Sequence, residues 1–312
     1  METNILIVDE IHERLLDRLK DAQLPFDYRP TINKEETQAI IANYTGLVIR
    51  SKFQVDAAFI ALAKNLTFIG RAGAGMDNID EAYATKNNIQ LISANEGNRD
   101  AVGEHMIGML LSLMNNLNRG HQEVTNGIWA REKNRGHELK GKTVALIGYG
   151  NNGQAMAKKL SGFDVTVIAY DKYKTGFSDN YAQEVAMEEI VKRADVLSFH
   201  IPLTQETKNM VDSEYLYHFR KPIFFLMGAR GGMVNIPAVL SYLDQGKILG
   251  AAFDVLPIEQ FPSLNEQAWF ENLRSRDNVL LSPHVAGWTF ESYYKLSDVL
   301  ATKIIALHKP NM

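Results

Sequence analysis

Several features that mark other classes of protein are missing from this sequence of 312 residues. It contains no cysteine, which excludes disulfide bonds, thiolate zinc sites and cysteine nucleophiles. No run of lysine or arginine stands out and the formal net charge is −4, so the basic footprint of a nucleic-acid-binding protein is absent. We therefore expect neither a nucleic-acid partner nor a metal centre.

Long apolar segments are also missing. The longest, around Met106 to Met114, is too short to span a bilayer. The N-terminus meets an acidic residue at once and lacks the basic region of a signal peptide. These two absences argue against a membrane partner and lead us to expect a cytoplasmic protein.

What is present is typical of an α/β protein with two domains. The chain is 46% hydrophobic and 22% charged, and it is too long for one compact core. Short apolar runs at Ile5–Val8, Leu47–Ile49 and Thr67–Ile69 alternate with segments of helix length, a pattern that predicts βαβ units and a parallel sheet. The stretch from Asp100 to Arg119 reads as one long buried helix.

A second series of alternating segments begins at Lys142. Its length, about six strands, is that of a full dinucleotide-binding sheet. The expected strands are Thr143–Ile147, Val165–Ala169, Val196–Phe199, Ile223–Leu226, Gly250–Phe253 and Val279–Leu281. The expected helices are Gln154–Leu160, Met187–Arg193, Pro237–Gln245 and, at the end of the chain, Phe290–Leu307.

A glycine-rich motif lies between the first strand and first helix of this series. Gly148 would permit the tight turn, Gly150 would let the backbone approach a pyrophosphate, and Gly153 would let the helix pack on the strand. The helix N-terminus would offer free N–H groups to the phosphates. Because the motif sits between a strand and a helix, it predicts a dinucleotide site rather than a chance glycine turn.

Asp171 ends the next strand, about 20 residues beyond the glycines. A carboxylate there accepts hydrogen bonds from ribose hydroxyls and repels a 2′-phosphate. The sequence therefore predicts NAD, in preference to NADP, as the cofactor.

Several further motifs, in the same order, resemble those of the D-isomer-specific 2-hydroxyacid dehydrogenase family. They are Val48-Ile-Arg50-Ser51, Gly70-Arg-Ala-Gly73-Ala-Gly75-Met-Asp77-Asn78-Ile-Asp80, His200-Ile-Pro202-Leu-Thr204, Ala229-Arg230-Gly-Gly232, Gly250-Ala-Ala-Phe-Asp254-Val and Ser282-Pro-His284-Val-Ala-Gly287. Within the family, the chain most resembles the phosphoglycerate dehydrogenase branch through Arg50-Ser51, the block at 70–73, Glu96-Gly-Asn98 and Trp129-Ala-Arg131.

The resemblance implies two Rossmann-like domains with doubly wound parallel sheets. A discontinuous substrate domain would comprise residues 1–95 plus 290–312, and an NAD-binding domain residues 96–289, with helices near 100–118 and 290–306 as the hinge. Family members are usually homodimers or homotetramers built on the nucleotide domains. The chain ends without the C-terminal serine-sensing domain of longer relatives, so feedback through such a domain is not expected.

The resemblance also implies a catalytic trio. His284 would act as the acid–base and Arg230 would bind the substrate carboxylate, a task for which a planar guanidinium is suited. Glu259 would orient the histidine. Glu266 remains the alternative carboxylate, because Gln260 replaces the family's usual proline and Phe261–Trp269 resembles an insertion.

Other roles are implied by the same resemblance. Residues expected to bind the cofactor, besides Gly148, Gly150, Gly153 and Asp171, are Asn151, Asn152, Ile201, Pro202, Gly228, Asp254 and Gly287. Gly228 departs from the family, which often has Thr or Cys there. Residues expected to bind substrate are Arg50, Ser51, Arg71, Ala72, Gly73, Ala74 and Asn98, with Arg131 supplied by a partner subunit.

The sequence leaves more than one candidate for the substrate and for the class of function. The phosphoglycerate branch would make the reaction an oxidation of 3-phosphoglycerate in serine biosynthesis, with Arg50 and Arg71 on the phosphate. Both arginines could instead stabilise turns, and the enzyme would then be a glyoxylate or hydroxypyruvate reductase or a D-lactate-type dehydrogenase. The C-terminal-binding-protein corepressors, NAD-responsive binding modules of the same fold, are a further alternative, against which the lack of a disordered tail argues.

Overall fold

The computed structural model describes residues 4–308, and the chain divides into two compact units. The first joins Met1–Arg99 to Trp288–Met312, and the second is Asp100–Gly287. The expected boundaries, 1–95 with 290–312 and 96–289, differ by a few residues because the segment around Glu96 and Gly97 packs within the first unit. Glu96 Oε2 lies 2.7 Å from Lys303 Nζ, and a Cβ on Gly97 would lie 2.7 Å from the Cα of Leu296.

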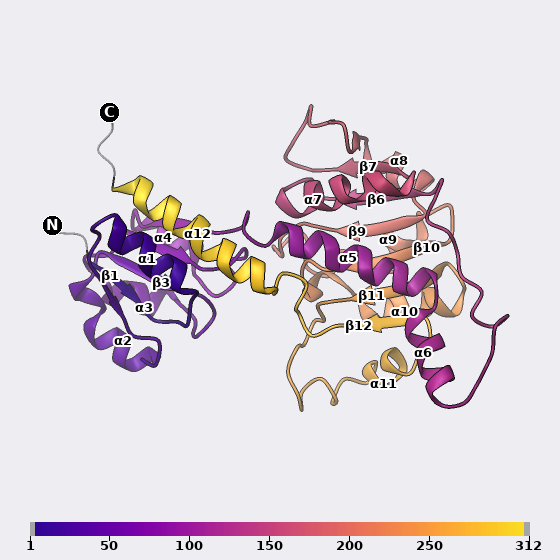
Figure 1. Ribbon diagram of the computed structural model, residues 1–312, viewed down its shortest axis with the longest axis horizontal. Coiled ribbons are helices and arrows are strands. Elements are labelled where there is room, and N and C mark those ends of the chain that lie inside the picture. Colours follow the sequence, from indigo (N-terminus) through magenta and orange to yellow (C-terminus); the bar gives the residue numbers. More distant parts are fainter. Residues whose placement is uncertain (1–3, 309–312) are drawn as a thin grey trace. The chain divides into compact units, whose positions relative to one another are not determined.

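The first unit is a parallel sheet with helices on both faces (Figure 1). In sheet order its strands are β2 (Phe26–Tyr28), β1 (Ile5–Ile7), β3 (Gly46–Ile49), β4 (Phe68–Arg71) and β5 (Gln90–Ser93). The helices are α1 (Glu13–Asp21), α2 (Lys34–Ile40), α3 (Ala57–Leu62), α4 (Glu81–Lys86) and α12 (Phe290–Leu307).

The C-terminal helix belongs to this unit because one of its faces is apolar at helical spacing. Leu296, Leu300 and Ile304 recur every four residues and pack with α1 on one face of the sheet. Asp298 fixes the pairing of the two helices, since Arg14 Nε and Arg18 Nη1 each lie 2.7 Å from its Oδ1. In Figure 1 the yellow α12 runs beside the indigo α1.

The second unit has a larger parallel sheet. In the described part of the chain its order is β12 (Val279–Leu281), β11 (Ile248–Phe253), β10 (Ile223–Met227), β9 (Val196–Phe199), β6 (Thr143–Ile147), β7 (Thr166–Tyr170) and β8 (Gln183–Glu184). The chain reverses its direction across the sheet between β6 and β9, which is where doubly wound folds bind ligands.

Helices cover both faces of this sheet as well. One face is buried by α5 (Arg99–Met114) and α7 (Asn151–Leu160), and the other by α8 (Met187–Arg193), α9 (Ser213–Tyr217) and α10 (Ile236–Asp244). The remaining helices are α6 (Leu117–Thr125) and α11 (Phe270–Arg274), with short 3-10 turns η1 (Ile41–Asn43), η2 (Ser161–Phe163) and η3 (Gly231–Met233). Both units confirm the α/β class with parallel sheets.

The expected single helix from Asp100 to Arg119 is wrong. Asn116 has a φ of 52°, which ends one helical run and begins another. The returning chain stabilises the break, because His137 N donates to Met114 O at 2.8 Å and Gly136 packs closely against the same carbonyl. Within residues 4–308, no helix is long and apolar enough to cross a membrane.

Candidate active site

The glycine motif forms the turn between β6 and α7. Gly148 has a φ of 94°, and a Cβ on it would lie 2.7 Å from His200 O. A Cβ on Gly153 would lie 2.3 Å from Gly148 O, whereas the position of a Cβ on Gly150 is open space. The turn therefore has no room for a side chain at Gly148 or Gly153. It has open space beside Gly150, which an approaching pyrophosphate requires.

This turn opens into a pocket of about 600 Å³ whose lining fits a dinucleotide. The first N–H groups of α7 have no partner within the helix, and Asn152 at its second position has a buried Oδ1 with no hydrogen-bond partner among the described residues. The lining residues include Gly148, Gly150, Tyr170, Asp171, Lys172, Met187, His200, Ile201, Pro202, Glu206, Met210 and Tyr215. Asn151 begins α7 beside them.

Asp171 lies on the wall of this pocket at the end of β7. Its Oδ2 accepts from Tyr149 N and its Oδ1 from Tyr173 N, both at 3.0 Å. The two neighbouring lysines bind other groups of the protein. Lys172 Nζ lies 2.7 Å from Glu206 Oε2, and Lys174 Nζ donates to Tyr149 O. A ribose diol suits this charge arrangement better than a 2′-phosphate.

Two of the aromatic lining residues that the sequence did not predict are His200 and Tyr215. Burial lowers the pKa of His200 to about 4, so the ring is neutral and can line an apolar pocket; Ser198 Oγ lies 3.0 Å from its Nε2. Tyr215 is partly buried, and its buried hydroxyl oxygen has no hydrogen-bond partner within the described range. His200 directly follows β9, the strand reached after the reversal, and Tyr215 lies on α9 in the connection from β9 to β10; the position of His200 at a strand end is the one signal that the sequence offered.

His284 and Glu259 meet at the end of β12. His284 Nδ1 lies 2.8 Å from Glu259 Oε2, and this hydrogen bond raises the pKa of His284 above its usual value, against the opposing effects of burial and of the Arg230 charge. Because Nδ1 is engaged, Nε2 is the ring nitrogen left for a reacting proton. Glu266 is exposed and makes no contact with the histidine in the part of the chain described here.

Arg230 follows β10 and precedes η3. Its Nη1 donates to Ala229 O at 2.7 Å, and it lies close enough to His284 to influence its titration. The adjoining glycine allows this, since a Cβ on Gly231 would lie 2.0 Å from the carbonyl carbon of Leu256. Gly228 is similarly crowded: a Cβ there would lie 2.3 Å from Met106 Sδ, so the methionine fills the space of the larger residue common in the family.

Arg50 and Ser51 lie in the first unit, in the turn after β3. Asp9 Oδ2 accepts the N–H groups of Arg50, Ser51 and Lys52 at 2.9, 2.8 and 2.9 Å, so these backbone donors are unavailable to a ligand. The Arg50 guanidinium lies 4.6 Å from the ring centre of Trp288 and pairs with no carboxylate of residues 4–308. It is the side chain, and not the backbone of this turn, that can bind substrate.

Some backbone N–H groups of the turn after β4 are also hydrogen-bonded within the protein. Ala72 N donates to Ile49 O at 2.9 Å and Gly73 N to Arg71 O at 2.8 Å, so two amides of this turn are hydrogen-bonded to protein carbonyls. A Cβ on Gly73 would lie 1.8 Å from Arg71 Nη1, so glycine makes room for the guanidinium.

Two other expected substrate residues lie outside these two turns in the sequence. Asn98 has a buried Oδ1 with no hydrogen-bond partner in the described chain. Arg131 is exposed in the second unit, in the segment after α6.

Two residues expected to bind the cofactor lie near His284 in the fold or the sequence. Asp254 directly follows β11, and Gly287 is the last residue of the second unit, three residues after His284.

Comparison with known proteins gives consistent matches. Residues 107–286 match the family described as D-isomer specific 2-hydroxyacid dehydrogenase, NAD binding domain. The chain is 31% identical over 310 residues to the D-3-phosphoglycerate dehydrogenase of Archaeoglobus fulgidus, covering 98% of this chain and 57% of that protein. It is 33% identical over 273 residues to the hydroxypyruvate reductase of Thermotoga maritima, covering 88% of each.

The fold matches solved structures over nearly the full chain. With the NAD-complexed D-isomer specific 2-hydroxyacid dehydrogenase of Lactobacillus delbrueckii ssp. bulgaricus the TM-score is 0.79 at 20% identity, covering 99% of both chains. The chain spans little more than half the length of the Archaeoglobus relative, so that protein's full activity does not transfer by similarity alone.

Proposed function

Because the chain belongs to the family of D-isomer specific 2-hydroxyacid dehydrogenases, we propose that it interconverts a D-2-hydroxy acid and its 2-keto acid. The family and its NAD-binding domain are established by the match over residues 107–286, so NAD is the cofactor. When bound, NAD supplies the acceptor or donor of the hydride. The observation that carries the proposal is the 2.8 Å contact of His284 Nδ1 with Glu259 Oε2, because it provides an oriented acid–base.

In this proposal each residue of the trio has one task. His284 Nε2 takes the hydroxyl proton during oxidation and returns a proton to the ketone oxygen during reduction. Glu259 stabilises the imidazolium form, consistent with the raised pKa of His284. Arg230 holds the substrate carboxylate with two parallel hydrogen bonds, a geometry that its planar guanidinium matches.

The substrate that we propose is D-3-phosphoglycerate, oxidised to 3-phosphohydroxypyruvate as a step of serine biosynthesis in the cytoplasm. The name of the Archaeoglobus relative supports this substrate. So does Arg50, whose guanidinium is stacked on Trp288 and carries no carboxylate partner among residues 4–308. A phosphate needs cations other than the arginine that binds the carboxylate.

A hydroxypyruvate or glyoxylate reductase is the second candidate. The 33% identity with the Thermotoga hydroxypyruvate reductase favours it. The use of the backbone donors after β3 by Asp9 also favours it, because a phosphate at that turn would lose three amide hydrogen bonds.

Steady-state turnover decides between these candidates. The purified protein should be assayed with NAD or NADH and with 3-phosphoglycerate, 3-phosphohydroxypyruvate, hydroxypyruvate, glyoxylate and D-lactate. We expect catalytic efficiency to be highest with the phosphorylated pair. Higher efficiency with the unphosphorylated acids would support the reductase, and NADH binding without turnover of any acid would indicate a binding module of the corepressor kind.

We further propose that the protein is a homodimer joined through its second unit. The helix α6 buries none of its residues, and Val124 is 53% exposed and the nearby Trp129 83% exposed. Such exposed apolar side chains on α6 and in the segment after it fit a second copy of the same chain. In this assembly Arg131 would reach the substrate of the partner subunit.

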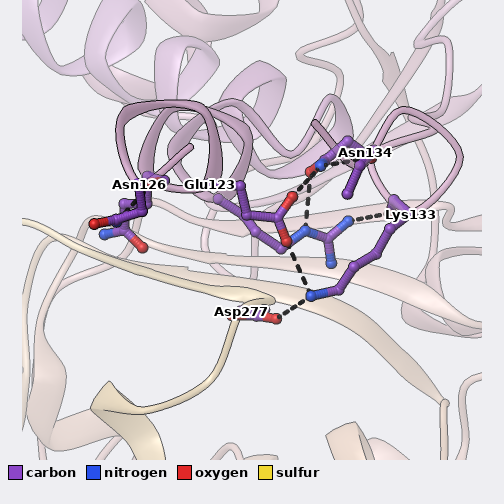
Figure 2. A network of polar contacts seen from close by, with 8 residues as sticks. Glu123, Asn126, Lys133, Asn134 and Asp277 are labelled. Carbon is purple, nitrogen blue, oxygen red and sulfur yellow. Dashed lines mark hydrogen bonds and ion pairs between the residues drawn. The ribbon is translucent and has the colours of Figure 1, made fainter. Parts of the chain in front are cut away.

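A polar network holds the segment that carries Trp129 and Arg131 (Figure 2). Glu123 on α6 lies 3.0 Å from Lys133 Nζ and accepts from Asn134 Nδ2 at 2.5 Å, while Lys133 also approaches Asp277. These contacts lower the pKa of Glu123. The segment is therefore fixed before any partner binds, which reduces the entropic cost of association.

Light scattering tests the assembly. The wild type should have twice the mass of one chain, or four times if two dimers pair, and Trp129→Ala should increase the monomer fraction. Tyr173→Ala, which removes another exposed aromatic residue of the same unit, is the matched control and should leave the mass unchanged. A monomeric wild type would contradict the proposal.

A further inference from the structure

The Asp254 carboxylate is buried at the end of β11 and accepts three hydrogen bonds from one short segment. The side chain accepts from Ser282 Oγ at 2.6 Å and from Val285 N at 2.9 Å through Oδ1, and from Ala286 N at 2.9 Å through Oδ2. Only 2% of the residue is exposed. A carboxylate with this little access to water depends on such donors, because an unpaired buried polar group is costly.

His284 lies between these donors in an unfavourable backbone conformation. Its φ is 55°, in the left-handed region that residues with a Cβ seldom adopt. Its own N–H donates to Asp254 O at 2.8 Å. Such a conformation persists only when its surroundings fix it, and here Asp254 supplies one of the fixing contacts, together with Ser282 O, which the same N–H reaches at 3.1 Å, and Glu259 on the ring.

His105, on α5, completes this arrangement from another element. Its Nε2 lies 3.0 Å from Ser282 Oγ and 3.6 Å from Asp254 Oδ1. Since the serine hydroxyl donates its hydrogen to the carboxylate, its oxygen must accept from His105, which assigns the ring proton to Nε2. Without that donor the hydroxyl could also turn toward Met109 Sδ, 3.7 Å away.

We infer that His105 is a positioning residue, which acts through Ser282 and Asp254 to hold residues 282–286 in the conformation that presents His284. This inference rests on the proposed role of His284 as the acid–base. Asp254 is also expected to contact the cofactor. The inference gives it a second role, which is to support the segment that carries His284.

Hydrogen exchange at the amides of Val285 and Ala286, measured by NMR, tests the support without any need for activity. His105→Phe keeps a ring of similar size but removes the donor, and Ser282→Ala removes the hydroxyl from the other end of the same link. Each should raise exchange at both amides by about tenfold, the effect of one lost hydrogen bond. Ser282→Thr retains the hydroxyl and should stay within about threefold of the wild type, as should His121→Phe, which changes an exposed histidine on α6.

Kinetics supply the second readout. Both disruptive variants should lower kcat by about tenfold while KM and the Kd for NADH, from fluorescence titration, change by less than about twofold. Unchanged exchange in both variants, or a loss confined to KM or to the Kd, would overturn the inference. If the exchange responds as expected but the wild type turns over no 2-hydroxy acid, the support stands and the proposed function fails.

Discussion

Glu259 Oε2 lies 2.8 Å from Nδ1 of His284, and it is the largest cause of the raised pKa of that histidine. Phe261–Trp269 begins two residues after the glutamate, yet the contact between Glu259 and His284 is made. The pair joins the two loops that follow β11 and β12, neighbouring strands of one sheet. An acid–base is thus held from two strand ends, with Nε2 left for the reacting proton.

Glu259→Gln should shift the pH profile in a defined direction. Reduction needs the imidazolium form, and the raised pKa keeps that form populated to higher pH in the wild type. Removing the carboxylate lowers the pKa, so reduction should decline at lower pH than in the wild type, while oxidation, which needs neutral histidine, should extend to lower pH. The measurement is kcat/KM against pH in both directions. Glu266→Gln is the control, and an equal shift in both variants would contradict the assignment.

His284→Ala should remove the acid–base without removing the cofactor site. Turnover should fall by about 10²–10⁴-fold, the usual scale for this kind of catalysis. The Kd for NADH should stay within about threefold, because the dinucleotide pocket is built by other residues. Stopped-flow turnover and fluorescence titration measure the two quantities. A variant that keeps a tenth of its activity would show that another group moves the proton.

Asp171→Asn should narrow the preference for NAD over NADP. The amide oxygen can still accept from Tyr149 N or Tyr173 N, so the fold of the pocket wall is preserved while the charge is lost. Efficiency with NAD should fall by roughly tenfold through the weaker ribose hydrogen bonds, and efficiency with NADP should rise. Asp164→Asn, at an exposed position, should change neither value. Equal wild-type efficiency with both cofactors would refute the role of Asp171.

Arg50→Ala should separate phosphorylated from plain substrates. Charge-assisted hydrogen bonds contribute about 1.5–3 kcal/mol each, so kcat/KM for 3-phosphoglycerate should fall by roughly one to two orders of magnitude. Glyoxylate and D-lactate have no phosphate and should lose less than about threefold. Arg230→Ala should instead damage all substrates, because they share the carboxylate. Equal losses for both substrate types in Arg50→Ala would make Arg50 a structural residue.

Two glycines of the second unit should differ sharply when replaced by alanine. A Cβ on Gly231 would lie 2.0 Å from backbone at Leu256, whereas one on Gly162 meets nothing within 4 Å. Gly231→Ala should lower the free energy of unfolding by about 1–3 kcal/mol and reduce activity, because Arg230 is its neighbour. Gly162→Ala should stay within about 0.5 kcal/mol of the wild type. Denaturant unfolding and turnover test the pair, and a stable, active Gly231→Ala variant would contradict the geometry.

The sequence predicted the buried parts of the fold better than its edges. Central strands of parallel sheets are apolar on both faces, so β6 and β9 appear as continuous apolar runs with the expected bounds. The strands that were missed, β2, β5 and β8, all lie at sheet edges and contain polar residues such as Asp27, Gln90 and Gln183. The break at Asn116 was missed because no glycine or proline marks it.

Some residues of the candidate site could be predicted from the sequence and others could not. Gly148 and Asp171 could be predicted because their roles depend on local order along the chain, strand, turn, helix and strand. The choice of Glu259 over Glu266 could not be made from spacing, since it depends on how the segment after β11 folds back on β12. The commitment of the Ala72 and Gly73 amides to protein carbonyls is also a tertiary property that no motif encodes.

Asp9 binds the backbone N–H groups of a turn in the first unit. It follows β1, and its three amide partners follow β3, at the place where the strand order of the first unit reverses. In related sheets that crevice is where phosphates bind. Here the side chain of Asp9 accepts all three N–H groups, so the backbone donors that a nucleotide phosphate would use in that crevice already have a partner within the protein.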